Sequence, residues 1–95
     1  MKAFERLIEY TKYPTGSDEN CAKCPSSEGQ RVFADFLVKE LKEIGIENAY
    51  VDEYGYVYAR ILANCERLKN KTIGFIAHMD TVSDVEYRNV KCRVI

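Results

Sequence analysis

The chain has 95 residues and a mass of 11.0 kDa, which suits one small domain, or part of a larger one, and excludes two full domains. Hydrophobic residues make up 46% and charged residues 31% of the sequence, as in a folded globular chain with one core. Fourteen Lys and Arg against 15 Asp and Glu give a net charge of -1, so we expect no nucleic-acid partner.

The sequence also predicts no membrane partner. No apolar run approaches the roughly 20 residues that a membrane-crossing helix needs. Glu5, Arg6 and Glu9 lie where a secretory signal would have to be apolar. We therefore expect a cytoplasmic chain with reduced cysteines.

Apolar residues at helical spacing predict a first helix over Lys2–Lys12. The segment Tyr13–Pro25 is rich in residues that favour turns and is predicted to be a loop. Ser27 and Gln30 then form a capping-box pattern, which predicts the start of a second helix. Gly45 suits the left-handed residue that ends many helices. The apolar face of this second helix comprises Phe33, Phe36, Leu37, Leu41 and Ile44.

Three strands are predicted after the second helix. Ala49–Glu53 and Tyr56–Leu62 are rich in Tyr and Val, and Tyr54-Gly55 between them favours a hairpin turn. Asn64–Lys71 is polar and predicted to be an exposed loop. Thr72–Ala77 is a short continuous apolar run, typical of a strand covered on both faces. We therefore predict an α/β chain: two helices, a hairpin and a buried strand in a mixed sheet.

His78-Met79-Asp80 follows the predicted buried strand and is the main candidate site. Residues two apart in extended backbone project to the same side, so the imidazole and the carboxylate can face one space. Ligands in open α/β sheets bind beyond the carboxyl ends of the strands, where this tripeptide falls. A neutral imidazole is a good Zn²⁺ ligand, and a carboxylate on its other ring nitrogen fixes the tautomer.

Taken alone, this short motif is equally compatible with a structural role. A single histidine at a strand end is often a hydrogen-bonded structural residue or simply exposed. Asp80 can also cap the turn that follows it.

Several blocks resemble the amino-terminal part of the catalytic domain of M20-family zinc peptidases, specifically the tripeptide aminopeptidases. They extend over nearly the whole chain in the expected order, and the last is the most specific. The blocks are Phe4-Glu5-Arg6-Leu7, Ser17-Asp18-Glu19, Pro25-Ser26-Ser27-Glu28-Gly29-Gln30, Lys39-Glu40-Leu41-Lys42-Glu43-Ile44-Gly45, Asp52-Glu53-Tyr54-Gly55-Tyr56-Val57-Tyr58-Ala59 and Ile73-Gly74-Phe75-Ile76-Ala77-His78-Met79-Asp80-Thr81.

The resemblance implies a dinuclear zinc aminopeptidase that removes the N-terminal residue of tripeptides. It implies that His78 is a metal ligand and that Asp80 is the catalytic residue that holds this imidazole. The sequence departs from the family at Cys21-Ala22-Lys23 and at Cys92, away from both positions.

The resemblance also implies that the site is incomplete in residues 1–95, which would form a partial catalytic domain. The family's two-zinc site draws on two histidines, and this chain has one. The apolar, uncapped ending Val94-Ile95 looks cut. We expect the chain alone to be inactive.

Three alternatives remain open. Cys21, Cys24, Cys65 and Cys92 permit a structural zinc module, although the last two are far apart and free thiols are favoured over both this and a redox role. A non-catalytic module that self-associates through an unfinished sheet is also possible. A stacking surface on Tyr50, Tyr54, Tyr56 and Tyr58 is disfavoured relative to packing, because no basic residues lie between them.

Overall fold

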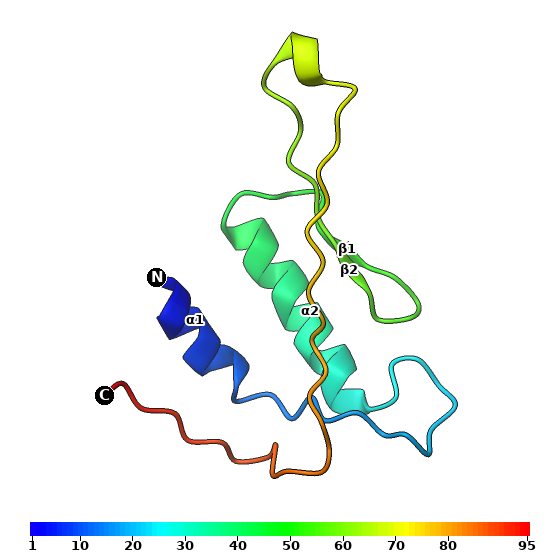
Figure 1. Cartoon of the computed structure of the whole chain (residues 1–95), viewed down its shortest axis with the longest axis vertical. Coiled ribbons are helices and arrows are strands. Elements are labelled where there is room, and N and C mark those ends of the chain that lie inside the picture. The colour runs from blue at the N-terminus through cyan, green and yellow to red at the C-terminus, as the bar shows by residue number, and fades with distance from the viewer.

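The computed structural model describes all 95 residues. Two helices, α1 (Ala3–Tyr10) and α2 (Glu28–Glu43), precede an antiparallel pair of short strands, β1 (Tyr50–Val51) and β2 (Val57–Tyr58) (Figure 1). A 3-10 turn, η1 (Glu66–Leu68), lies on an arm that projects away from the helices. The chain thus combines helices with a sheet, as predicted, but the sheet is antiparallel and not mixed. Neither helix is long and apolar enough to cross a membrane.

The start of α2 is where the sequence predicts it, but its capping differs. Ser27 is the N-cap, yet its hydroxyl is buried and has no hydrogen-bond partner. The amide of Gln30 instead donates to the hydroxyl of Ser26, at 3.3 Å. The predicted capping box is therefore wrong. The Gln30 amide bonds to the neighbouring Ser26, whose hydroxyl also accepts the N–H of Asp18 in the preceding loop.

The end of α2 follows the prediction closely. Gly45 has a φ of 107°, in the left-handed region that a side chain would disfavour. Its N–H bonds to the carbonyl of Lys42 at 3.0 Å, and the N–H of Ile46 bonds to that of Leu41 at 2.9 Å. These two bonds form a Schellman motif, which satisfies the last carbonyls of the helix.

A small aromatic cluster joins α1 to α2. The ring of Tyr10 packs edge-on against Phe33 at 5.3 Å between centroids, and Tyr13 lies 4.9 Å from Phe36. The hydroxyl of Tyr10 donates to the carboxylate of Glu40 at 2.6 Å. Burial, and to a lesser extent this carboxylate, raises the pKa of Tyr10. The core is small: its buried hydrophobic residues are Phe33, Ala34 and Ala49.

The hairpin forms at the predicted place but is shorter than predicted. Tyr50 pairs with Tyr58, and their rings stack at 5.1 Å. The turn is closed by the carboxylate of Asp52, which accepts the N–H groups of Tyr54 and Tyr56 at 2.9 Å each. Each of these four tyrosines is about half exposed, so the predicted packing holds only for the stacked pair.

The buried strand predicted over Thr72–Ala77 is absent. The segment forms no backbone hydrogen bond, and Ile73, Phe75 and Ile76 are 83%, 96% and 100% exposed. Apolar residues become a buried strand only where neighbouring strands and covering layers are available. The two-residue strands β1 and β2 pair with each other and leave this segment without a partner.

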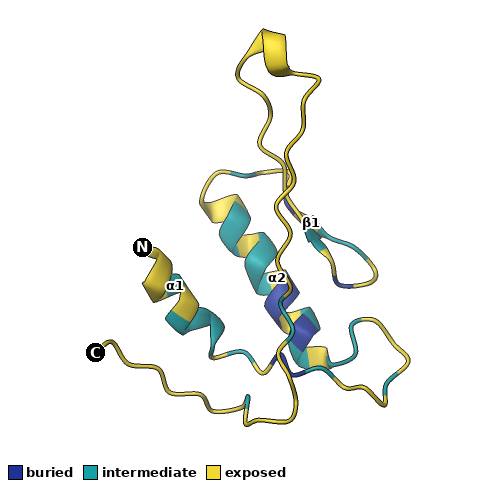
Figure 2. Ribbon diagram, viewed as in Figure 1, coloured by how far each residue is buried: buried dark blue, intermediate teal, exposed yellow.

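The fold is open. Its accessible surface is 8184 Å², against about 5,600 Å² for a compact monomer of this mass. Its radius of gyration is 15.6 Å, against about 12 Å for a compact chain of this length. Exposed residues cover the projecting arm and the last third of the chain, while buried residues gather on α2 and beside it (Figure 2).

Candidate functional site

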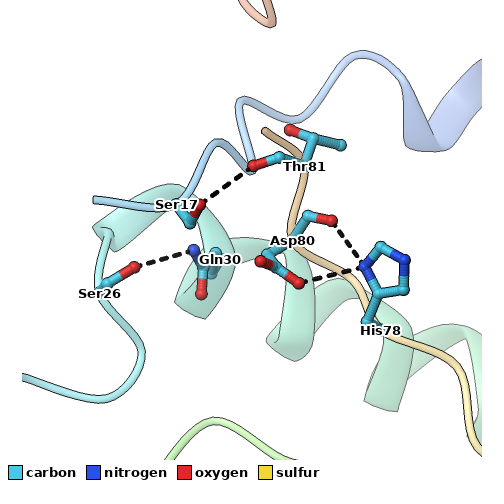
Figure 3. Close-up of polar contacts among 6 residues, drawn as sticks. All are labelled: Ser17, Ser26, Gln30, His78, Asp80 and Thr81. Carbon is cyan, nitrogen blue, oxygen red and sulfur yellow. Dashed lines mark hydrogen bonds and ion pairs between the residues drawn. The ribbon is translucent and has the colours of Figure 1, made fainter. Parts of the chain in front are cut away.

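His78 and Asp80 form a bonded pair on the extended segment after the projecting arm (Figure 3). The Nδ1 atom of His78 lies 2.9 Å from the carbonyl oxygen of Asp80 and 3.1 Å from its carboxylate. An ionised carboxylate and a carbonyl only accept hydrogen bonds, so Nδ1 must carry the proton. The other ring nitrogen, Nε2, is then left with a free lone pair. The His78 side chain is 84% exposed, so a ligand can reach it.

A short backbone bridge holds the residue that follows this pair. The N–H of Thr81 donates to the carbonyl of Thr15 at 3.0 Å, and the N–H of Ser17 donates to the carbonyl of Thr81 at 2.9 Å. The Ser17 hydroxyl donates to the same carbonyl at 3.3 Å (Figure 3). This pairing is an isolated parallel bridge between Gly16 and Thr81. It connects the loop after α1 to the segment that carries the candidate site.

The same loop is held against the N-terminal end of α2. The hydroxyl of Ser26 accepts the N–H of Asp18 at 2.9 Å and the Gln30 amide from the first turn of the helix. A Cβ atom at Gly29 would lie 1.8 Å from the carbonyl oxygen of Pro14. The helix and the loop are therefore in direct backbone contact, and α2 indirectly positions Thr81.

The structure does not bring the four cysteines together. The thiol of Cys24 donates to the carbonyl of Tyr54 at 3.3 Å, and that of Cys92 lies 3.2 Å from the hydroxyl of Thr11. All four thiols are free. No group of three or more His, Cys, Asp and Glu side chains is placed to hold a metal ion.

The donor set fits one ligand position of a zinc site, with its orienting carboxylate. Imidazole Nε2 is a standard zinc ligand, and a carboxylate bonded to Nδ1–H is its common companion. A catalytic zinc needs about three protein ligands, and only His78 is placed as one here.

His78 and Asp80, the two residues singled out from the sequence, thus lie together and bond to each other. Their setting differs from the prediction, because they follow an unpaired extended segment and not a buried strand. Sequence reasoning missed the bridge through Ser17 and Thr81. The one available signal was Gly16, a small residue inside a loop rich in turn formers.

Comparison with known proteins gives a consistent result. No family profile matches the chain. Proteins called peptidase T match it in Halothermothrix orenii (50% identity) and in Caldanaerobacter subterraneus subsp. tengcongensis (52%), each over 99% of this chain and 23% of the relative. The Bacillus subtilis peptidase T is 45% identical over 96% of this chain and 22% of the relative. The chain spans about a quarter of the length of these relatives. Over its whole length, this chain is similar to the amino-terminal segment of peptidase T.

Proposed function

We propose that this chain supplies the amino-terminal part of a zinc-dependent M20-type aminopeptidase that releases the N-terminal residue of tripeptides. The observation that carries the proposal is the His78–Asp80 pair, in which Nδ1–H is bonded and Nε2 is free and exposed. The similarity to peptidase T over almost the whole chain supports the same reading. A cytoplasmic location belongs to this proposal, because a reducing compartment preserves free thiols.

Two side chains have distinct parts in this proposal. His78 would hold one of two zinc ions through Nε2. Asp80 would keep the proton on Nδ1, orient the ring and make Nε2 more basic. A bound zinc supplies a water of lowered pKa and polarises the scissile carbonyl. The further ligands and the general base would come from residues outside these 95.

The test is reconstitution from two pieces. Residues 1–95 are expected to give no tripeptide hydrolysis with zinc, because a single histidine cannot hold a catalytic metal. Mixing or co-expressing them with the part of a peptidase T relative that this chain does not cover is expected to restore zinc-dependent release of the N-terminal residue.

Two results would count against the proposal. One is turnover by the 95-residue chain alone that follows the protein through purification. The other is a stable complex of the two pieces that binds no zinc and has no activity. The second piece alone is the matched control.

A second candidate function, self-association as a non-catalytic module, is favoured by the exposed apolar segment Thr72–Ala77. Its unpaired backbone and its exposed Phe75 and Ile76 are features that promote strand pairing between chains. Sedimentation at micromolar concentration is expected to show a dimer, and Phe75→Lys is expected to return it to monomer. A wild-type chain that sediments as a monomer would exclude this candidate.

A further inference from the structure

The segment that carries the candidate site has very little attachment to the rest of the molecule. From residue 72 to residue 95, the only backbone hydrogen bonds to other parts of the chain are the two at Thr81. The flanking arm and the His78 side chain are exposed. The position of the imidazole therefore depends on the two backbone hydrogen bonds of Thr81, the residue that follows Asp80.

We propose that the bridge between Gly16 and Thr81 positions the His78–Asp80 pair, with Ser17 as the positioning residue. Ser17 makes two of the three bonds at this point, one through its N–H and one through its hydroxyl, both to the carbonyl of Thr81. This assignment rests on the proposed function for its biological meaning, but its geometry stands apart from any metal.

The bridge acts on the pair through the backbone of Asp80 and Thr81. The Asp80–Thr81 peptide unit is held directly by its N–H, which donates to Thr15, while Ser17 holds the next peptide unit through the Thr81 carbonyl. Together these bonds limit rotation on both sides of the Thr81 Cα atom. The carbonyl oxygen of Asp80 belongs to the Asp80–Thr81 peptide unit, and it is one of the two acceptors for His78 Nδ1. Loss of the bridge therefore loosens one of the two acceptors that hold the proton on Nδ1, and leaves the Asp80 carboxylate as the other.

One side of the bridge also packs against a later part of the chain. A Cβ atom at Gly16 would lie 2.4 Å from the ring of Tyr87, so the loop and the later part of the chain are in close contact there. Thr15 and Gly16 are both buried. Thr81 itself and the bond from the Ser17 hydroxyl are exposed, so the buried side of the bridge is the one that Thr15 and Gly16 form.

The test removes one N–H and leaves every side chain in place. Residues 1–23 can be synthesised and ligated at Cys24 to residues 24–95, so that position 17 carries the α-hydroxy acid analogue of serine. The ester oxygen then faces the carbonyl of Thr81 and repels it. The same replacement at Glu19, whose N–H makes no hydrogen bond, is the matched control.

The readout is the imidazole tautomer of His78, measured from ¹⁵N chemical shifts in the metal-free chain with the ring neutral. The native chain and the Glu19 control are expected to show the Nδ1–H form alone. The position-17 ester, and independently Ser17→Pro, are expected to show a mixture that includes the Nε2–H form, with faster exchange of the Thr81 amide.

An unchanged Nδ1–H tautomer in both position-17 variants would overturn the positioning role. The single-atom ester keeps the experiment decisive if Ser17→Pro does not fold. No metal enters the measurement, so failure of the zinc proposal would be seen separately, as a lack of zinc binding in the reconstituted enzyme.

Discussion

Replacement of His78 by alanine is expected to lower kcat/KM of the reconstituted aminopeptidase by about 10³-fold or more. A catalytic zinc stabilises the transition state by several kcal/mol, and each 1.36 kcal/mol is a tenfold change in rate. Removing a ligand from a site that has about three protein ligands should release that zinc. Metal analysis of the purified complex is expected to show a matching loss of bound zinc.

Asp80→Asn tests the orienting carboxylate while it leaves the proposed metal ligand, His78, in place. The amide oxygen can still accept the Nδ1–H bond but carries no charge, so zinc affinity is expected to fall by about 10- to 100-fold and to recover at higher zinc concentration. Lys71→Ala, a change at an exposed residue earlier in the same segment, is expected to leave activity unchanged. Equal effects of His78→Ala and Asp80→Asn, with full zinc retained in both, would contradict the assigned roles.

These variants should leave the fold intact. The His78 side chain is 84% exposed and that of Asp80 is 47% exposed, so neither fills the core. Circular dichroism of both variants is expected to match the native chain. A loss of activity can then be assigned to the site and not to unfolding.

The parts of the fold that the sequence predicted well are those with local causes. The second helix begins after Ser27, as predicted, although the Ser27 hydroxyl makes no capping bond. It is closed by Gly45, a residue that acts within one turn of the helix end. The hairpin turn at Gly55 has the same local character, with a φ of 83°. The strands around it are shorter than predicted because their length depends on partners that the sequence pattern does not show.

The missed strand and the missed bridge share a non-local cause. Thr72–Ala77 has the composition of a buried strand, but burial requires a neighbouring strand that residues 1–95 do not provide. The contact of Ser17 with Thr81 joins residues far apart in the sequence, and no periodicity marks it. The His78–Asp80 contact was predictable because two residues separated by one position can meet without any tertiary context.

Gly29→Ala is expected to destabilise the chain by about 3 kcal/mol, although alanine usually stabilises a helix relative to glycine by about 1 kcal/mol. The new Cβ atom would lie 1.8 Å from the carbonyl oxygen of Pro14 and 2.9 Å from its carbonyl carbon. Backbone atoms cannot rotate away as a flexible side chain can, so the loop must move off α2. That loss is a large part of the stability of a small domain.

Urea denaturation followed by far-ultraviolet circular dichroism measures this effect. Val32→Ala is the control, since Val32 lies on the same helix and is 49% exposed, and it should change the free energy of unfolding by about 0.5 kcal/mol or less. Thr15 directly follows Pro14 and accepts the N–H of Thr81, so Gly29→Ala should also speed exchange of the Thr81 amide. A stabilised Gly29→Ala chain would show that this loop does not rest on α2, and the anchoring of the His78 segment to the helix would fail with it.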